Sequence, residues 1–203
     1  MKSNQSGRSM LEMLGVLSII GVLSAGGIAG YTKMMERQKI NATMQQINII
    51  AAKISSVGSM ANSYGGLNNE SATKLNAIPY EALTETSGTL VNPFGGSIEI
   101  AGSFLLEDKS DAEHPQAYAI KYSGLSQEAC VSLASSAWNK SRQAALLGIG
   151  VGADADLSIY QGCPGTSSVA CPEGSTTSLP MDISKARAAC NCQNNCVLVM
   201  KYF

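Results

Sequence analysis

The chain contains few charged side chains, and neither sign of charge dominates. Lys and Arg together number 14 and Asp and Glu together number 15 among 203 residues, so the formal net charge is -1. A nucleic-acid-binding surface needs a concentration of positive charge, and this composition offers none. We therefore predict no nucleic-acid partner.

The motifs of common catalytic and metal sites are also missing. His114 is the only histidine, no Gly-x-Ser-x-Gly sequence points to a hydrolase, and no Cys-x-x-Cys pair points to a thioredoxin-like redox site. Asp154 and Asp156 could begin a calcium site, but the acidic ligands that should follow are absent, which favours a solvated turn. The sequence predicts no enzyme, no metal and no cofactor.

Cysteine is absent from the first 129 residues and then occurs six times. An even number of cysteines in one region is typical of disulfides in an exported protein, although six allow fifteen pairings and spacing alone selects none. The cluster near the C-terminus would suit zinc only with a second Cys-x2-4-Cys pair or added histidines, so disulfides are the better interpretation. The cysteines are Cys130, Cys163, Cys171, Cys190, Cys192 and Cys196.

A run of twenty residues without charge, 13–32, lies near the N-terminus. Twenty residues at about 1.5 Å each just span a hydrocarbon core of about 30 Å. Lys2 and Arg8 precede the run with no acid before Glu12, which places the N-terminus in the cytoplasm and the rest of the chain outside. We expect a transmembrane helix and a head in an oxidising compartment.

Helical periodicity continues beyond the apolar run, which predicts one helix over 8–62 with an amphipathic part at 33–62. An ordinary signal peptide cut near Gly26 is the alternative, but a cleaved signal would not be continuous with a helix of the mature protein. No proline occurs from Met10 through Ala61. Apolar or small residues recur in alternating steps of four and three, at Ile40, Met44, Ile47, Ala51, Ile54, Gly58 and Ala61.

The start of this helix resembles the processing site of type IV pilins and type II secretion pseudopilins. The stretch from Gly7 and Arg8 to Glu12, followed by apolar residues, matches a short basic leader that ends in Gly and a Glu at the fifth mature position. The resemblance implies that prepilin peptidase cuts between Gly7 and Arg8 and that the new amino terminus is N-methylated. The family usually has an apolar residue where this chain has Arg8.

The resemblance also implies how the helix is used. Glu12 is expected to pair with the N-terminal amine of an adjacent subunit, since a carboxylate in an apolar bundle needs a cation. Arg8, four residues earlier, is the alternative partner, in the less favourable order along the helix. Gly26 and Gly30 have the GxxxG spacing that lets helices approach closely, although glycine is common in membrane helices generally.

The partners implied are identical or related pilin subunits, prepilin peptidase, the assembly platform of the inner membrane, and the membrane itself. The precursor would lie in the inner (cytoplasmic) membrane with its head outside. After assembly it would belong to an extracellular pilus or a periplasmic pseudopilus. A minor pilin or pseudopilin is one alternative function, and a secreted or membrane-anchored binding module with an ordinary signal peptide is another.

Residues 1–7 are thus the expected leader, and residues 63–203 the expected head, of α+β class with an antiparallel sheet and disulfides. Residues 92–96, Asn-Pro-Phe-Gly-Gly, resemble a turn of type IVb pilin heads and predict a tight turn before a strand. The sequence up to about Ser87 is expected to be irregular. Strands are predicted at 97–101, 103–107 and 118–122 as an antiparallel meander, a buried strand at 196–203, a helix at 126–142 with Ser126 as N-cap, and a glycine-rich connection at 148–152.

In type IVb heads, a cysteine on a head helix is commonly joined to one near the C-terminus. By that resemblance Cys130 would pair with Cys190, Cys192 or Cys196, three alternatives that the residues leave open. Cys163 with Cys171 would be a local second bond.

Overall fold

The structure, a computed structural model, describes residues 6–61, 63–86, 88–103, 116–138, 146–153, 155, 162–163, 177–178 and 180–203. Side chains are described from residue 10 onward, and at 162–163 and 177–178 only the backbone is described. The chain divides into two compact units, Met1–Gln38 and Lys39–Phe203.

The long N-terminal helix that the sequence predicts is confirmed. Helix α1 runs without interruption over Ser6–Ala61 and contributes to both units. The absence of proline lets every backbone N–H in its interior donate to the carbonyl four residues earlier.

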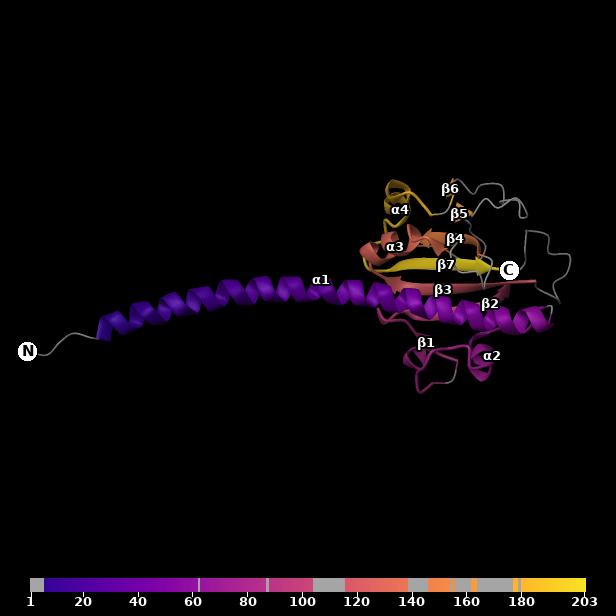
Figure 1. Ribbon diagram of the computed structural model, residues 1–203, viewed down its shortest axis with the longest axis horizontal. Helices are drawn as coiled ribbons and strands as arrows, with labels where there is room; N and C mark the ends of the chain where they lie inside the picture. The colour runs from indigo at the N-terminus through magenta and orange to yellow at the C-terminus, as the bar shows by residue number, and fades with distance from the viewer. Residues whose placement is uncertain are drawn as a thin grey trace, which may run out of the picture. The chain divides into compact units, whose positions relative to one another are not determined.

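The head is built on one seven-stranded sheet, with the strands in the order β1-β2-β3-β7-β4-β5-β6. All neighbouring pairs are antiparallel except β5 and β6. The last strand of the chain, β7, therefore lies between β3 and β4, as Figure 1 shows. The strands are β1 Leu90–Val91, β2 Ser97–Ser103, β3 Ala117–Leu125, β4 Leu146–Gly152, β5 Gly162–Cys163, β6 Thr177–Ser178 and β7 Cys196–Tyr202.

The C-terminal part of α1 packs on one face of this sheet and forms the main core. Ile47, Ile50 and Ile54 are fully or almost fully buried there, in one cluster with Tyr118 and Tyr122 of β3. These isoleucines lie on one face of the helix because they are separated by three and four residues. Burying a side chain of this size stabilises a fold by about 1.5 to 3 kcal/mol.

A buried hydroxyl fixes the register between α1 and β3. The Tyr118 hydroxyl donates to the Ala51 carbonyl at 2.8 Å and lies 2.7 Å from Ser55 Oγ. Burial raises the pKa of the Tyr118 hydroxyl well above its ordinary value, so this group keeps its proton and remains a donor. The Tyr118 ring also lies between those of Tyr64 and Tyr202, with centroid distances of 4.8 and 5.3 Å.

The predicted turn at residues 92–96 is confirmed and joins β1 to β2. Asn92 Oδ1 accepts hydrogen bonds from the backbone N–H groups of Phe94 and Gly96, and Gly95 has a φ of +87°, which favours glycine. A methyl group added to Gly96 would lie 1.8 Å from the Ser123 carbonyl oxygen. Glycine is thus required at Gly96 for close backbone contact with β3.

A side chain continues the edge of the sheet beside the start of β1. Asn69 Nδ2 donates to the carbonyls of Gly88 and Ile98 at 2.9 Å each, and Asn69 Oδ1 accepts from the Ile100 N–H at 2.8 Å. Further along β2, the Gly102 N–H donates to the Leu67 carbonyl. These bonds occupy backbone groups of β2 that would otherwise form an open edge.

The segment before β1, expected to be irregular, contains helix α2, Asn69–Lys74, and a 3-10 turn, Tyr80–Ala82. The prediction was wrong because it passed over an N-terminal capping box. The Asn68 side chain accepts from the Ser71 N–H, and the Ser71 side chain accepts from the Asn68 N–H.

The meander is only partly correct, because β7 rather than a consecutive strand follows β3 in the sheet. The predicted strands 97–101 and 103–107 are not separated as expected, since β2 continues to Ser103, and 104–107 lie outside the described residues. The glycine-rich connection at 148–152 is strand β4, and all seven of its residues are buried. Glycine lowers strand propensity, which is why the local sequence did not predict a strand here.

The helix predicted at 126–142 is shorter than expected. Ser126 is its N-cap, but α3 covers Gln127–Ala134. Ser135 and Ser136 end it, because their hydroxyls donate back to the carbonyls of Val131 and Ser132. A further helix that the sequence analysis did not predict, α4 over Ile183–Ala189, follows the N-cap Asp182.

We predict that Asn69→Ala destabilises the head by about 2 to 3 kcal/mol, because three hydrogen bonds of about 1 kcal/mol each are lost at a partly buried site. Urea unfolding of the full chain in detergent micelles measures this. Lys74→Ala, which removes only an exposed pair with Glu70, is the control and should leave the midpoint unchanged. Equal midpoints for the two variants would show that the edge does not depend on Asn69.

Candidate functional site

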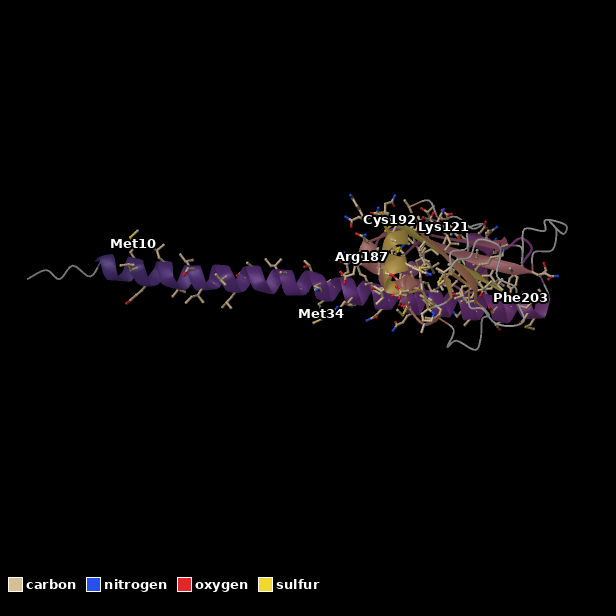
Figure 2. All side chains as sticks on the ribbon, turned by 90° about the horizontal axis from the view of Figure 1, so that it is seen from above. Met10, Met34, Lys121, Arg187, Cys192 and Phe203 are labelled. Carbon is tan, nitrogen blue, oxygen red and sulfur yellow. A yellow bond between two sulfur atoms is a disulfide. The ribbon has the colours of Figure 1, made fainter. Side chains whose placement is uncertain are left out.

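The N-terminal part of α1 presents an apolar surface on all sides. Every residue from Met10 to Met34 is exposed, including Glu12. Figure 2 shows side chains projecting around the helix between the labelled Met10 and Met34. A methyl group added at Gly26 or Gly30 would meet no atom within 4 Å. This segment therefore has an unoccupied surface, with small residues where another helix could approach.

By length and composition this helix is able to cross a membrane. Glu12 is the only acidic residue between Met10 and Met34, and Lys33 the only basic one. A carboxylate at the edge of such a run is costly to place in hydrocarbon unless a cation neutralises it. The charge of Glu12 is consequently the feature of this surface that most needs a partner.

Gly7 and Arg8, the predicted processing residues, lie in the first turn of α1. The structure describes their backbone but not their side chains. The alternative ion pair between the Arg8 and Glu12 side chains is therefore not tested and stays a prediction. His114, Asp154 and Asp156 lie outside the described residues.

Among the described residues, two disulfides join Cys130 of α3 to Cys190 at the C-cap of α4, and Cys192 of the following connection to Cys196 of β7. Cys130 is bonded to Cys190, one of the three partners that the resemblance left open, with a Cα–Cα distance of 5.9 Å. Cys192 is bonded to Cys196 with a Cα–Cα distance of 5.1 Å. Both distances lie in the usual range for disulfides. The proposed bond between Cys163 and Cys171 lies outside the described side chains.

Sequence reasoning did not assign the Cys192–Cys196 bond. The available signal was their short spacing: once Cys130 is joined to Cys190, the two remaining cysteines of the C-terminal cluster are separated by only three residues. The metal interpretation of this cluster requires free thiolates, and all four sulfur atoms are in disulfides.

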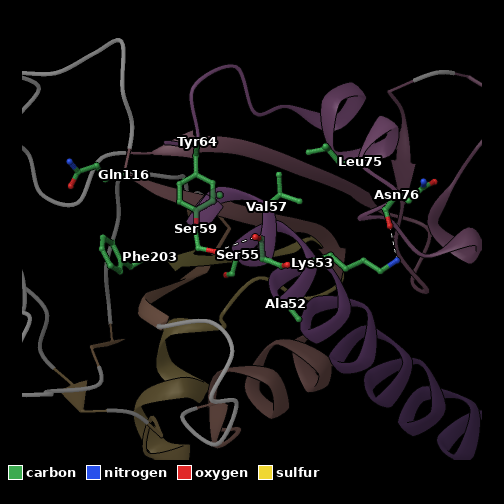
Figure 3. A pocket seen from close by; sticks show the side chains of 12 residues that line it. Ala52, Lys53, Ser55, Val57, Ser59, Tyr64, Leu75, Asn76, Gln116 and Phe203 are labelled. Atoms are coloured by element: carbon green, nitrogen blue, oxygen red, sulfur yellow. Dashed lines mark hydrogen bonds between the residues drawn. The ribbon is translucent and has the colours of Figure 1, made fainter. Parts of the chain in front are cut away.

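An open groove of about 960 Å³ lies beside the C-terminal end of α1. Figure 3 shows Lys53, Tyr64, Asn76 and Phe203 around it, with the Lys53 ammonium donating to the Asn76 carbonyl at 2.6 Å. None of the described side chains that line the groove is a carboxylate, histidine or cysteine. Its polar side chains are those of Lys53, Tyr64, Asn76, Gln116 and three serines.

The fold defines a class of protein that combines a helix able to cross a membrane with a disulfide-linked α+β head. A family model described as PilS N terminal matches residues 37–201, which is more than half of the chain. The chain belongs to this family and is a type IV pilin with a head of the type IVb kind, a structural subunit of a pilus.

Individual pilins are similar to this chain over much of its length. The toxin coregulated pilin of Vibrio cholerae is 29% identical over 168 residues, which cover 79% of this chain and 70% of that pilin. The major structural subunit of the bundle-forming pilus of Escherichia coli O127:H6 is 24% identical over 133 residues, which cover 66% of this chain and 65% of that subunit.

A solved structure supports the fold. The crystal structure of TcpA, a type IV pilin from the El Tor biotype of Vibrio cholerae, has a TM-score of 0.55 to this chain at 17% identity. The similarity covers 81% of this chain and 98% of that chain. The α+β class predicted from the sequence is confirmed.

We predict that the two disulfides contribute unequally to stability. Closing the loop between Cys130 and Cys190, 60 residues apart, is worth about 4 kcal/mol in the chain-entropy model, and the short Cys192–Cys196 loop about 2 kcal/mol. Cys130→Ala/Cys190→Ala should therefore lower the free energy of unfolding more than Cys192→Ala/Cys196→Ala. Urea unfolding of the full chains in detergent measures both, and the opposite order would contradict the prediction.

Proposed function

We propose that this pilin is made as a precursor of the inner (cytoplasmic) membrane, cut by prepilin peptidase between Gly7 and Arg8, and polymerised through α1 into a type IV pilus. Residues 1–7 would be the leader, 13–32 the membrane span, and 63–203 the head outside. The observation that carries the proposal is the complete exposure of the apolar helix between Met10 and Met34.

Such a surface requires an apolar environment both before and after assembly. Each exposed Leu, Ile or Val side chain gains about 1.5 to 3 kcal/mol when it is removed from water. A bilayer provides this environment for the precursor, and a bundle of identical helices provides it in a filament. The same surface thus serves two states, and Gly26 and Gly30 allow helices to pack closely in the second.

Glu12 would control the passage between these states. At the membrane edge its carboxylate stays hydrated, whereas in a helix bundle it needs a cation, which the processed amino terminus of a neighbouring subunit supplies. The amino terminus exists at this position only after the cut at Gly7. Processing and assembly are therefore linked through one ion pair between subunits.

In this proposal the head has a structural role and no catalytic one. The support for this role is that the related proteins are pilus subunits by name. The other proposed partners are further pilin subunits and the assembly platform of the inner membrane.

We expect the mature protein to begin at Arg8. Mass spectrometry of protein from the native membrane should give the mass of residues 8–203, lowered for disulfides and raised by one methyl group, and a Gly7→Val variant should keep its leader. Ser6→Ala is the matched control and should be processed normally. A mature chain that begins near Gly26 would instead indicate an ordinary signal peptide.

We expect Glu12→Ala to reduce assembled pilus by more than about tenfold, because the loss of one buried ion pair per subunit is repeated along the filament. The amount of assembled pilus is measured in sheared surface fractions by immunoblot and electron microscopy. Ser18→Ala, which removes only a hydroxyl bonded to the Gly15 carbonyl, should assemble normally. If Glu12→Ala is processed, stable and still forms filaments, the ion-pair mechanism is wrong.

A further inference from the structure

The two described disulfides lie against each other. The Sγ atoms of Cys130, Cys192 and Cys196 all lie within 4.8 Å of one another, although Cys130 belongs to one disulfide and the other two cysteines form the second. A thiolate released from Cys192 or Cys196 would therefore lie next to the Cys130–Cys190 bond. Thiol–disulfide exchange proceeds by attack of a thiolate on a disulfide sulfur, so it needs sulfur atoms close together as well as a free thiolate.

The four sulfur-bearing residues differ in their access to solvent. Cys130, Cys190 and Cys196 are completely buried, whereas Cys192 is partly exposed. Figure 2 shows the labelled Cys192 near Arg187 of α4. The Cys192–Cys196 bond closes a small ring, and the three residues inside it, 193–195, are all exposed. Solvent access is thus confined to the residue Cys192, and the folded head gives an external thiol no direct access to the Cys130–Cys190 bond.

We propose that the Cys192–Cys196 bond is an exchange site for the buried Cys130–Cys190 bond. Through it an external dithiol reduces Cys130–Cys190, and the oxidised form of that dithiol forms the bond again. The small ring acts as a relay that is used and then restored. A small dithiol or a dithiol oxidoreductase fits this site, since only one sulfur has to enter.

The chemistry balances as a transfer of two electrons. A thiolate of the dithiol attacks Cys192 Sγ, and Cys196 leaves as a thiolate. Cys196 then attacks Cys130 Sγ, forms a Cys130–Cys196 bond and releases Cys190, which takes up a proton. After these steps the free thiol is that of Cys190, and the buried Cys130–Cys190 bond is broken.

The remaining steps restore the relay. The second thiol of the dithiol attacks the first sulfur of the same dithiol, which is bonded to Cys192 Sγ. The mixed disulfide breaks and releases the oxidised dithiol and the Cys192 thiolate. Cys192 attacks Cys196, re-forms the Cys192–Cys196 bond and releases Cys130, which takes up a proton. The net result is an oxidised external dithiol, reduced Cys130 and Cys190, and an intact small ring; oxidation follows the same steps in reverse.

The relay explains how a fully buried bond could be formed or repaired in a folded head. Without it, exchange at Cys130–Cys190 requires opening of α3 and α4 around the bond, and such openings are rare in a packed core. With it, the opening is confined to the ring at residues 192–196, of which 193–195 are exposed.

The test compares reduction of Cys130 and Cys190 in the full chain and in Cys192→Ala/Cys196→Ala, both in detergent. Each is exposed to dithiothreitol under native conditions, quenched with acid and alkylated, and the two cysteines are followed by peptide mass spectrometry. We expect reduction in the variant to be slower by at least about tenfold. Equal or faster reduction in the variant would overturn the proposal.

A second measurement uses the unmodified chain and does not depend on folding of the variant. With less than one equivalent of dithiothreitol and rapid acid quenching, crossed Cys130–Cys196 peptides should accumulate before Cys130 becomes free. The appearance of free Cys130 and Cys190 with no crossed peptide at any time would contradict the relay. Matched Cys196→Ala chains should contain the Cys130–Cys192 pair, because Cys192 then lies free beside Cys130.

Discussion

The structure depends on one helix that must satisfy two different environments. Between Met10 and Met34, α1 exposes apolar side chains in every direction, whereas between Ile40 and Ile54 it buries one face in the head. The same backbone conformation serves both because an α-helix satisfies its own hydrogen bonds in lipid, in protein and in water. Only the distribution of side chains changes along its length.

The head is arranged around the part of α1 that it must hold. The hydroxyl of Tyr118 donates to the Ala51 carbonyl of α1, and its ring is stacked on that of Tyr202 and tilted against that of Tyr64. Since Tyr202 ends the central strand β7, the C-terminus and α1 contact the same tyrosine.

The cysteines strengthen the chain where it enters that central strand. Cys190 ties the end of α4 to α3, and the Cys192–Cys196 ring lies immediately before and within the start of β7. The last strand, β7, must insert between β3 and β4, and both of these strands are distant from β7 in the sequence. Covalent bonds at its entry reduce the entropy lost in forming these long-range pairs.

The sequence by itself determined the features that depend on local periodicity and charge. The apolar run, the face that carries Ile47 and Ile54, the turn at Asn92 and the N-cap at Ser126 are all readable because neighbouring residues produce them. The processing site at Gly7 and the role of Glu12 are predictions of the same kind, drawn from motif and charge, and they stay predictions.

Only the tertiary structure decided what depends on distant neighbours. The glycine-rich stretch at 148–152 is a buried strand because β7 lies beside it, Asn69 completes the edge of β2 from outside the sheet, and Cys130 joins Cys190 rather than Cys192 or Cys196. In each case the contact is made with a residue that is distant in the sequence and is brought close by folding. Local sequence preferences therefore cannot predict it.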